Sequence, residues 1–154
     1  MLVLTFQVGR EAFALDIRRV REVVPRVRLR PVSGAPDWLA GLFVYRGQPV
    51  PVLDLHRLAG AGECPPHLSS RIILVPHRVE GEERLLGLLA AQVADIRELR
   101  PQSQPQPRLT VQGQPDLGPV LVDGREIVHV VELDRLLPES YRRQLALVPT
   151  ELPA

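Results

Sequence analysis

Residues 36–55 read PDWLAGLFVYRGQPVPVLDL, and this stretch decides the fold. Two apolar runs, residues 41–45 and 49–55, lie on either side of the tripeptide Arg46-Gly47-Gln48. This pattern predicts a β-hairpin, because a glycine in a tight turn adopts a positive φ at little cost. Pro49 and Pro51 lack N–H donors, so we expect their strand at a sheet edge or a bulge.

The same style of short strand and glycine-containing turn recurs along the chain. Residues 2–8 alternate in side-chain polarity, and after Gly9-Arg10 residues 11–15 return as a second strand. Further strands are expected at residues 71–76, 85–91 and 93–99, with a last hairpin at 120–122 and 126–131 around Asp123-Gly124. Short strands without alternating long helices predict a mainly β protein built of small antiparallel barrels.

The expected helices are few and short. Asp16 is a candidate N-cap, and Ile17, Val20, Val23 and Val24 recur at helical spacing until Pro25, which predicts a short amphipathic helix. Further helical turns are expected at Trp38-Leu39, at residues 54–58 and from residue 132 past Pro138.

Composition excludes several classes of protein. The 154 residues carry a formal net charge of +1, which argues against a general nucleic-acid binder. The single cysteine, Cys64, excludes an internal disulfide framework and a multi-cysteine metal site. The chain has neither a signal-peptide pattern nor an apolar run of about 20 residues, so we expect a cytoplasmic protein without membrane insertion.

The order of these elements resembles the CheW family over nearly the whole chain. Residues 6–24, FQVGREAFALDIRRVREVV, are similar to the opening of that family. The most specific likeness is the ordered set of Pro36, Gly41, Arg46, Gly47, Pro51, Asp54 and Leu55. The second half matches more loosely, since Ala91 replaces the Asp that is customary after Gly87-Leu88-Leu89.

The resemblance implies a fold and a function. It implies one domain, residues 1–154, of two intertwined five-stranded SH3-like barrels whose halves meet near residues 60–70. Residues 101–119 are expected as an exposed Pro/Gln-rich loop and residues 149–154 as a frayed tail.

The implied function is that of a non-catalytic adaptor. It would couple the cytoplasmic helical hairpin of a chemoreceptor, held in a hydrophobic groove between the barrels, to the regulatory domain of a CheA-like histidine kinase. Divergent family members serve several arrays, surface-sensing ones included, so the pathway stays open.

The expected partner-binding residues lie in two segments. Arg46 at the turn tip can make bidentate contacts, with a brace inside the barrel as the alternative, and Gly47 shapes that turn. In the other segment, Ile17, Val20 and Val23 form an apolar stripe that faces either a partner or the core, and Glu22 either pairs across an interface or is solvated.

Other classes of site find little support. The histidines, His56, His67, His77 and His129, show no metal-ligand spacing, so we expect neither metal nor cofactor. One alternative function is an SH3-like or OB-like barrel that binds nucleic acid through the arginine-rich residues 18–30. Another is a hydrolase that uses Asp54 with His56 or His129.

Overall fold

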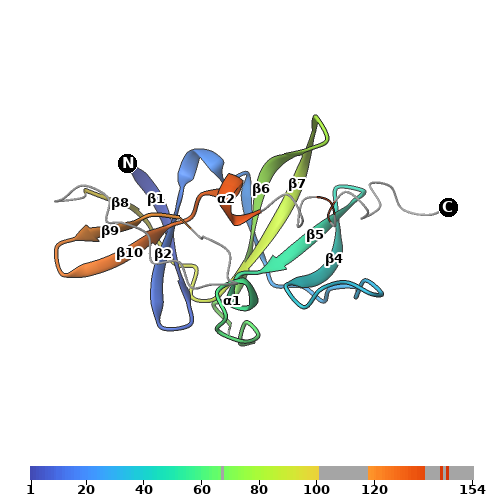
Figure 1. The fold of residues 1–154 in the computed structure, drawn as a ribbon, viewed down its shortest axis with the longest axis horizontal. Helices are drawn as coiled ribbons and strands as arrows, with labels where there is room; N and C mark the ends of the chain where they lie inside the picture. The colour runs from blue at the N-terminus through green and yellow to red at the C-terminus, as the bar shows by residue number, and fades with distance from the viewer. Residues whose placement is uncertain (67, 101–117, 138–142, 144, 146–154) are drawn as a thin grey trace.

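The computed structural model of the chain describes residues 1–66, 68–100, 118–137, 143 and 145 (Figure 1). Most of the expected Pro/Gln-rich loop, the tail at 149–154 and the continuation of the last helix past Pro138 lie outside the described residues. Within the described part, no helix has the length and apolar character needed to cross a membrane.

Five strands form the first sheet, in the order β8-β1-β2-β10-β9. Its members are β1 (Leu2–Val8), β2 (Glu11–Asp16), β8 (Ile96–Glu98), β9 (Val120–Asp123) and β10 (Glu126–Val130). Neighbours are antiparallel except β10, which runs parallel to β2 with Val128 opposite Ala12. The first and last hairpins of the sequence therefore pair with each other, as the sequence alone did not indicate.

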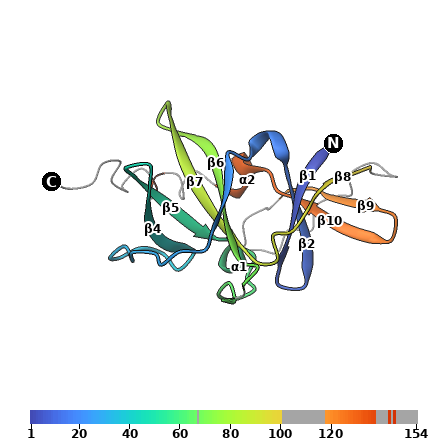
Figure 2. The same cartoon turned by 180° about the vertical axis from the view of Figure 1, so that it is seen from behind.

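The second sheet also has five strands, in the order β3-β6-β7-β5-β4. Its members are β3 (Glu22–Pro25), β4 (Leu39–Tyr45), β5 (Gln48–Asp54), β6 (Arg71–Val79) and β7 (Glu82–Ala90). Paired backbone hydrogen bonds between Arg30 and Leu42, of 2.7 and 2.8 Å, join the chain after β3 to β4. The expected mainly β fold with two five-stranded sheets is confirmed (Figures 1 and 2).

The chain passes between the two sheets twice. Strands β1 and β2 begin the first sheet, β3 to β7 make the second, and β8 to β10 return to the first. Residues 60–70 connect α1 (Leu55–Leu58) to β6, both on the second sheet, and a Cβ placed on Gly9 would lie 3.2 Å from Ala61. That loop thus touches the first hairpin, although the chain crosses between the sheets elsewhere.

A shared core joins the two sheets into one body. One buried cluster takes side chains from the first sheet, from the second sheet and from the short helices α1 and α2 (Leu133–Leu136), among them Phe6, Phe13, Leu53, Leu88 and Leu136. Each sheet also has a smaller cluster of buried apolar side chains on the face turned away from the shared core. Because large apolar side chains from both sheets interlock, neither sheet moves independently at low cost.

Some local expectations are wrong, among them the helical turn at Trp38-Leu39, because Leu39 begins β4. The helix predicted from Ile17 to Val24 is only a 3-10 turn, Ile17–Arg19, after which β3 begins. Valine is β-branched and favours an extended backbone. Strand β6 also offers backbone hydrogen bonds to these residues, which they would not make as a helix. The sequence predicts Pro49 and Pro51 at a sheet edge or a bulge. Strand β5 lies inside the sheet, but only its residues 52–54 pair with β7, so both prolines lie where the strand pairs on one side only, with β4.

The cap at Asp16 gives a prediction about acid stability. Its carboxylate accepts the Arg18 backbone N–H at 3.0 Å and pairs with the Arg18 guanidinium at 2.7 Å, which lowers the pKa of Asp16 below 3.8. We expect Asp16→Ala to lower the free energy of unfolding by about 1 kcal/mol at neutral pH. A depressed folded pKa means that this contribution is full above 3.8 and is lost as the pH falls through the lower folded value.

Urea denaturation of both proteins at neutral and acidic pH checks this expectation. Asp16→Asn is the matched control, because it keeps a side-chain oxygen for the cap without the charge. A stability difference between wild type and Asp16→Ala that persists unchanged in acid contradicts the assignment.

Candidate partner-binding surface

The β4–β5 turn is a two-residue turn, one residue tighter than expected. Tyr45 pairs with Gln48, which belongs to β5, so only Arg46 and Gly47 lie in the turn. Their φ angles of 49° and 80° are both positive, as a type I′ turn requires. Both residues are exposed, so the Arg46 side chain projects from the surface.

The turn is linked to β3 through an aromatic side chain. The Arg46 guanidinium lies over the Tyr45 ring, 5.2 Å from its centroid. The Tyr45 hydroxyl donates a hydrogen bond to the Glu22 carboxylate, which raises the pKa of Tyr45. We call Glu22, Tyr45 and Arg46 the turn cluster. Sequence reasoning named Arg46 and Glu22 but missed Tyr45, whose only signal was its position on the strand next to the turn.

The apolar stripe of Ile17, Val20 and Val23 is divided between the core and the surface. Ile17 and Val20 are half-buried and pack against the shared core. Val23 is 38% exposed on β3, next to Glu22. The structure thus brings Glu22 onto the side that holds Arg46, while Val23, the next residue of the strand, points to the opposite face, and Ile17 and Val20 mostly face inward.

A hollow of about 390 Å³ lies where the first 3-10 turn, β6, β7 and α2 meet. Its lining mixes apolar Pro76, Leu133 and Leu137 with charged Arg19, Arg78 and Asp134. This hollow is therefore mixed in polarity.

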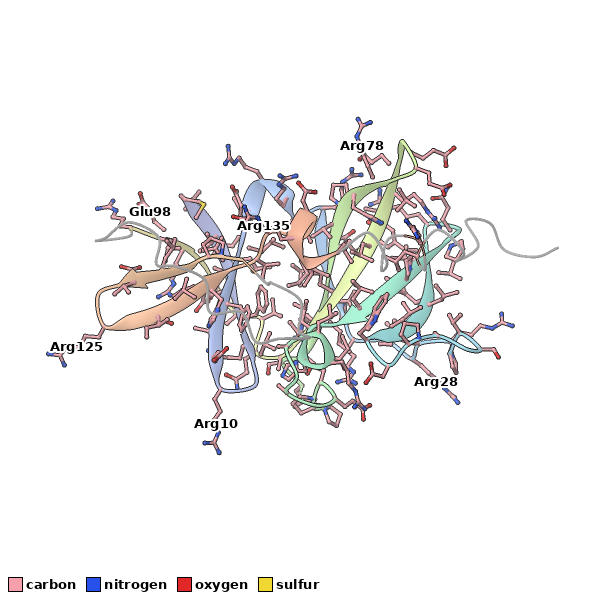
Figure 3. All side chains as sticks on the ribbon, in the orientation of Figure 1. Arg10, Arg28, Arg78, Glu98, Arg125 and Arg135 are labelled. Carbon is pink, nitrogen blue, oxygen red and sulfur yellow. The ribbon has the colours of Figure 1, made fainter. Side chains whose placement is uncertain are left out.

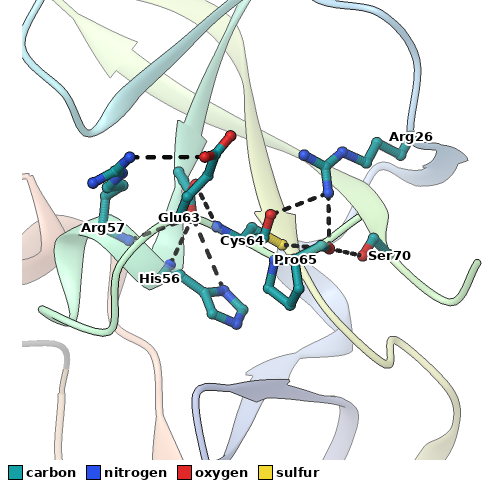
Figure 4. A network of polar contacts seen from close by, with 8 residues as sticks. Arg26, His56, Arg57, Glu63, Cys64, Pro65 and Ser70 are labelled. Carbon is teal, nitrogen blue, oxygen red and sulfur yellow. Dashed lines mark hydrogen bonds and ion pairs between the residues drawn. The ribbon is translucent and has the colours of Figure 1, made fainter. Parts of the chain in front are cut away.

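Asp54 organises the loop after β5 through the backbone of His56, Arg57 and Cys64, three residues labelled in Figure 4. Its Oδ1 accepts the backbone N–H of His56 at 2.9 Å and of Arg57 at 3.4 Å, and its Oδ2 accepts that of Cys64 at 2.9 Å. The carboxylate is 3% exposed. These bonds cap α1 and tie the following loop to β5, which explains an Asp at this point of the motif.

Neither histidine of the hydrolase alternative, His56 or His129, lies at the surface in an arrangement that could catalyse hydrolysis. His56 is buried beside Asp54, and burial lowers the pKa of its imidazole. His129 lies on the other sheet, stacked on Phe13 at 4.7 Å with its Nε2 3.2 Å from Glu11. Although the histidines lack metal-ligand spacing in the sequence, the fold brings His56 close to both Asp54 and Cys64.

Some arginines of the arginine-rich residues 18–30 make contacts within the protein. Arg18 pairs with Asp16, and Arg21 lies 3.4 Å from Glu83. Arg26 donates to the carbonyl oxygens of Cys64 and Pro65, at 3.3 and 2.9 Å. Half of the six arginines between 18 and 30 are thus engaged, which weakens the case for a phosphate-binding face.

Two five-stranded sheets with a shared core and an exposed arginine at a hairpin tip are the setting in which the comparisons with known proteins are read. The family profile described as CheW-like domain matches residues 2–140. The chain belongs to the CheW-like family, whose members are non-catalytic adaptors of chemotaxis signalling.

Relatives agree with that membership. The chain is 28% identical over 143 residues to the chemotaxis protein CheW of Rhizobium meliloti, covering 91% of this chain and 89% of the relative. It is 27% identical over 152 residues to that of Treponema pallidum, covering 94% and 86%. The scaffolding protein TtCheW from Thermoanaerobacter tengcongensis shares the fold, with a TM-score of 0.73, 24% identity and coverage of 91% and 89%.

Proposed function

We propose that this chain couples the cytoplasmic helical hairpin of a chemoreceptor to the regulatory domain of a CheA-like histidine kinase. The observation that carries the proposal is the family match through residues 2–140, which spans both sheets and includes the Arg46-Gly47 turn. The chain would act in the cytoplasm, where the receptor hairpin and the kinase are found.

The mechanism is positional. Two binding surfaces on one body hold the kinase at a fixed orientation to the receptor, so that a small receptor movement biases kinase activity. The shared core supports this role, because a body that flexed between its sheets would lose the orientation.

The turn cluster is the receptor-binding surface in this proposal. Arg46 supplies planar N–H donors for a carboxylate of the receptor helix, and Gly47 sets the turn that presents them. Glu22 extends the surface along β3, and Val23 contributes from the opposite face of that strand. Ile17 and Val20 contribute through the half-buried parts of their side chains that the core leaves accessible.

A three-component binding experiment tests the proposal. The purified protein is expected to hold a receptor cytoplasmic fragment and the kinase regulatory domain at the same time, as one complex in size-exclusion chromatography. Competition between the two partners for one surface contradicts the coupling function. Retention of single-stranded DNA in place of both favours the nucleic-acid alternative.

A further inference from the structure

The fold gathers three potential metal ligands that are spread over the sequence. Asp54 ends β5, His56 lies in α1 and Cys64 follows the loop, and His56 and Cys64 are both drawn in the polar network of Figure 4. A carboxylate oxygen, an imidazole nitrogen and the thiol sulfur all lie within 4.8 Å of one another. All three residues are at most 3% exposed.

An unsatisfied polar atom at this place calls for a ligand. The buried Nδ1 of His56 has no hydrogen-bond partner among the described residues. It lies 4.0 Å from Asp54 Oδ1, which is too long for a hydrogen bond. A buried imidazole nitrogen without a protein partner is costly, and an ordered water or a bound ion can satisfy it.

We propose that Asp54, His56 and Cys64 bind a Zn²⁺ ion, in place of the metal-free protein that the sequence predicted. Oxygen, nitrogen and sulfur are the donors that Zn²⁺ takes in proteins, and water can complete the tetrahedron. The charges also balance, because one carboxylate and one thiolate neutralise a divalent ion at a buried site. The Cys64 thiol gives its proton to water as the zinc–sulfur bond forms.

The loop between α1 and Cys64 allows the site to close. Zinc bonds are about 2.0–2.3 Å long, so the three donors must approach by about 1 Å to share one ion. Gly60 and Gly62 have positive φ angles of 75° and 81° in this exposed loop, and such backbone adjusts readily. Ala61 lies against Gly9, so a bound ion would also fix the loop against the first hairpin.

The test uses the full chain, stripped of metal with a chelator and titrated with Zn²⁺ in a calorimeter. We expect one equivalent to bind, and Co²⁺ to give the charge-transfer absorption of a cobalt–thiolate bond. Cys64→Ser and His56→Gln are each expected to weaken Zn²⁺ binding by at least about tenfold. His129→Gln is the matched control and is expected to bind as wild type, because His129 lies on the other sheet.

A second readout needs no variant, in case the substitutions impair folding. Zn²⁺ is expected to protect Cys64 of the wild-type protein from alkylation under mildly denaturing conditions. Absence of a stoichiometric site, or equal affinity in wild type, Cys64→Ser and His56→Gln, overturns the proposal. Receptor and kinase binding are not measured here, so the outcome is independent of the adaptor function.

Discussion

Substituting alanine for Gly41 is expected to lower the free energy of unfolding by about 3 kcal/mol or more. Gly41 has a φ of 149°, which L-residues rarely adopt, and such strain costs of order 1–3 kcal/mol. A Cβ at this position would also lie 2.7 Å from the carbonyl oxygen of Arg30 and 2.9 Å from the Cβ of Leu29. Backbone cannot yield as a flexible side chain can, so the overpacking adds to the strain.

The affected contact closes the second barrel. Arg30 and Leu42 exchange backbone hydrogen bonds beside Gly41, and separating these segments would break both. Thermal unfolding is expected to show a melting temperature lower by about 10 °C for a chain of this size.

Gly34→Ala is the matched control for this prediction. Gly34 also has a positive φ, 74°, but a Cβ there would have no neighbour within 4 Å. It is expected to cost about 1 kcal/mol, the penalty of backbone strain alone. Equal losses in the two variants would show that the close approach to Arg30 contributes nothing.

Replacing Arg46 with alanine is expected to weaken receptor binding about thirtyfold, or about 2 kcal/mol, while kinase binding is largely spared. Arg46 is exposed at the hairpin tip, and its recorded contact is with the Tyr45 ring. Loss of that contact and of the exposed aliphatic part of the Arg46 side chain lowers the free energy of unfolding by about 1 kcal/mol at most. The substitution is therefore expected to reduce receptor affinity much more than it reduces the stability of the fold.

Calorimetry with each partner and a thermal melt measure the two quantities on one preparation. Arg125→Ala is the matched control, because Arg125 also lies exposed in a two-residue hairpin turn, at the far end of the first sheet (Figure 3). Arg46→Lys keeps the charge but loses the fork of donors, so an intermediate affinity is expected. An Arg46→Ala protein that melts much lower yet binds the receptor normally would make Arg46 a brace.

Most strands could be read from the sequence because hairpins are local. The turn at Arg46-Gly47, the first hairpin around Gly9 and the last around Gly124 all rest on residues close in sequence. The helical turn at residues 54–58 was also expected from the sequence, whereas its cap by Asp54 was recognised only in the structure. Membership of the family followed from the order of these same residues.

Only the tertiary structure decided what residues distant in sequence do together. Ile17, Val20, Val23 and Val24 have a helical spacing, yet residues 22–25 form a strand because β6 offers backbone partners that no local pattern reveals. The contact between Tyr45 and Glu22 and the meeting of Asp54 with Cys64 depend in the same way on how the barrel closes. Local backbone preference determined the turns and caps, whereas long-range pairing determined which side chains share a site.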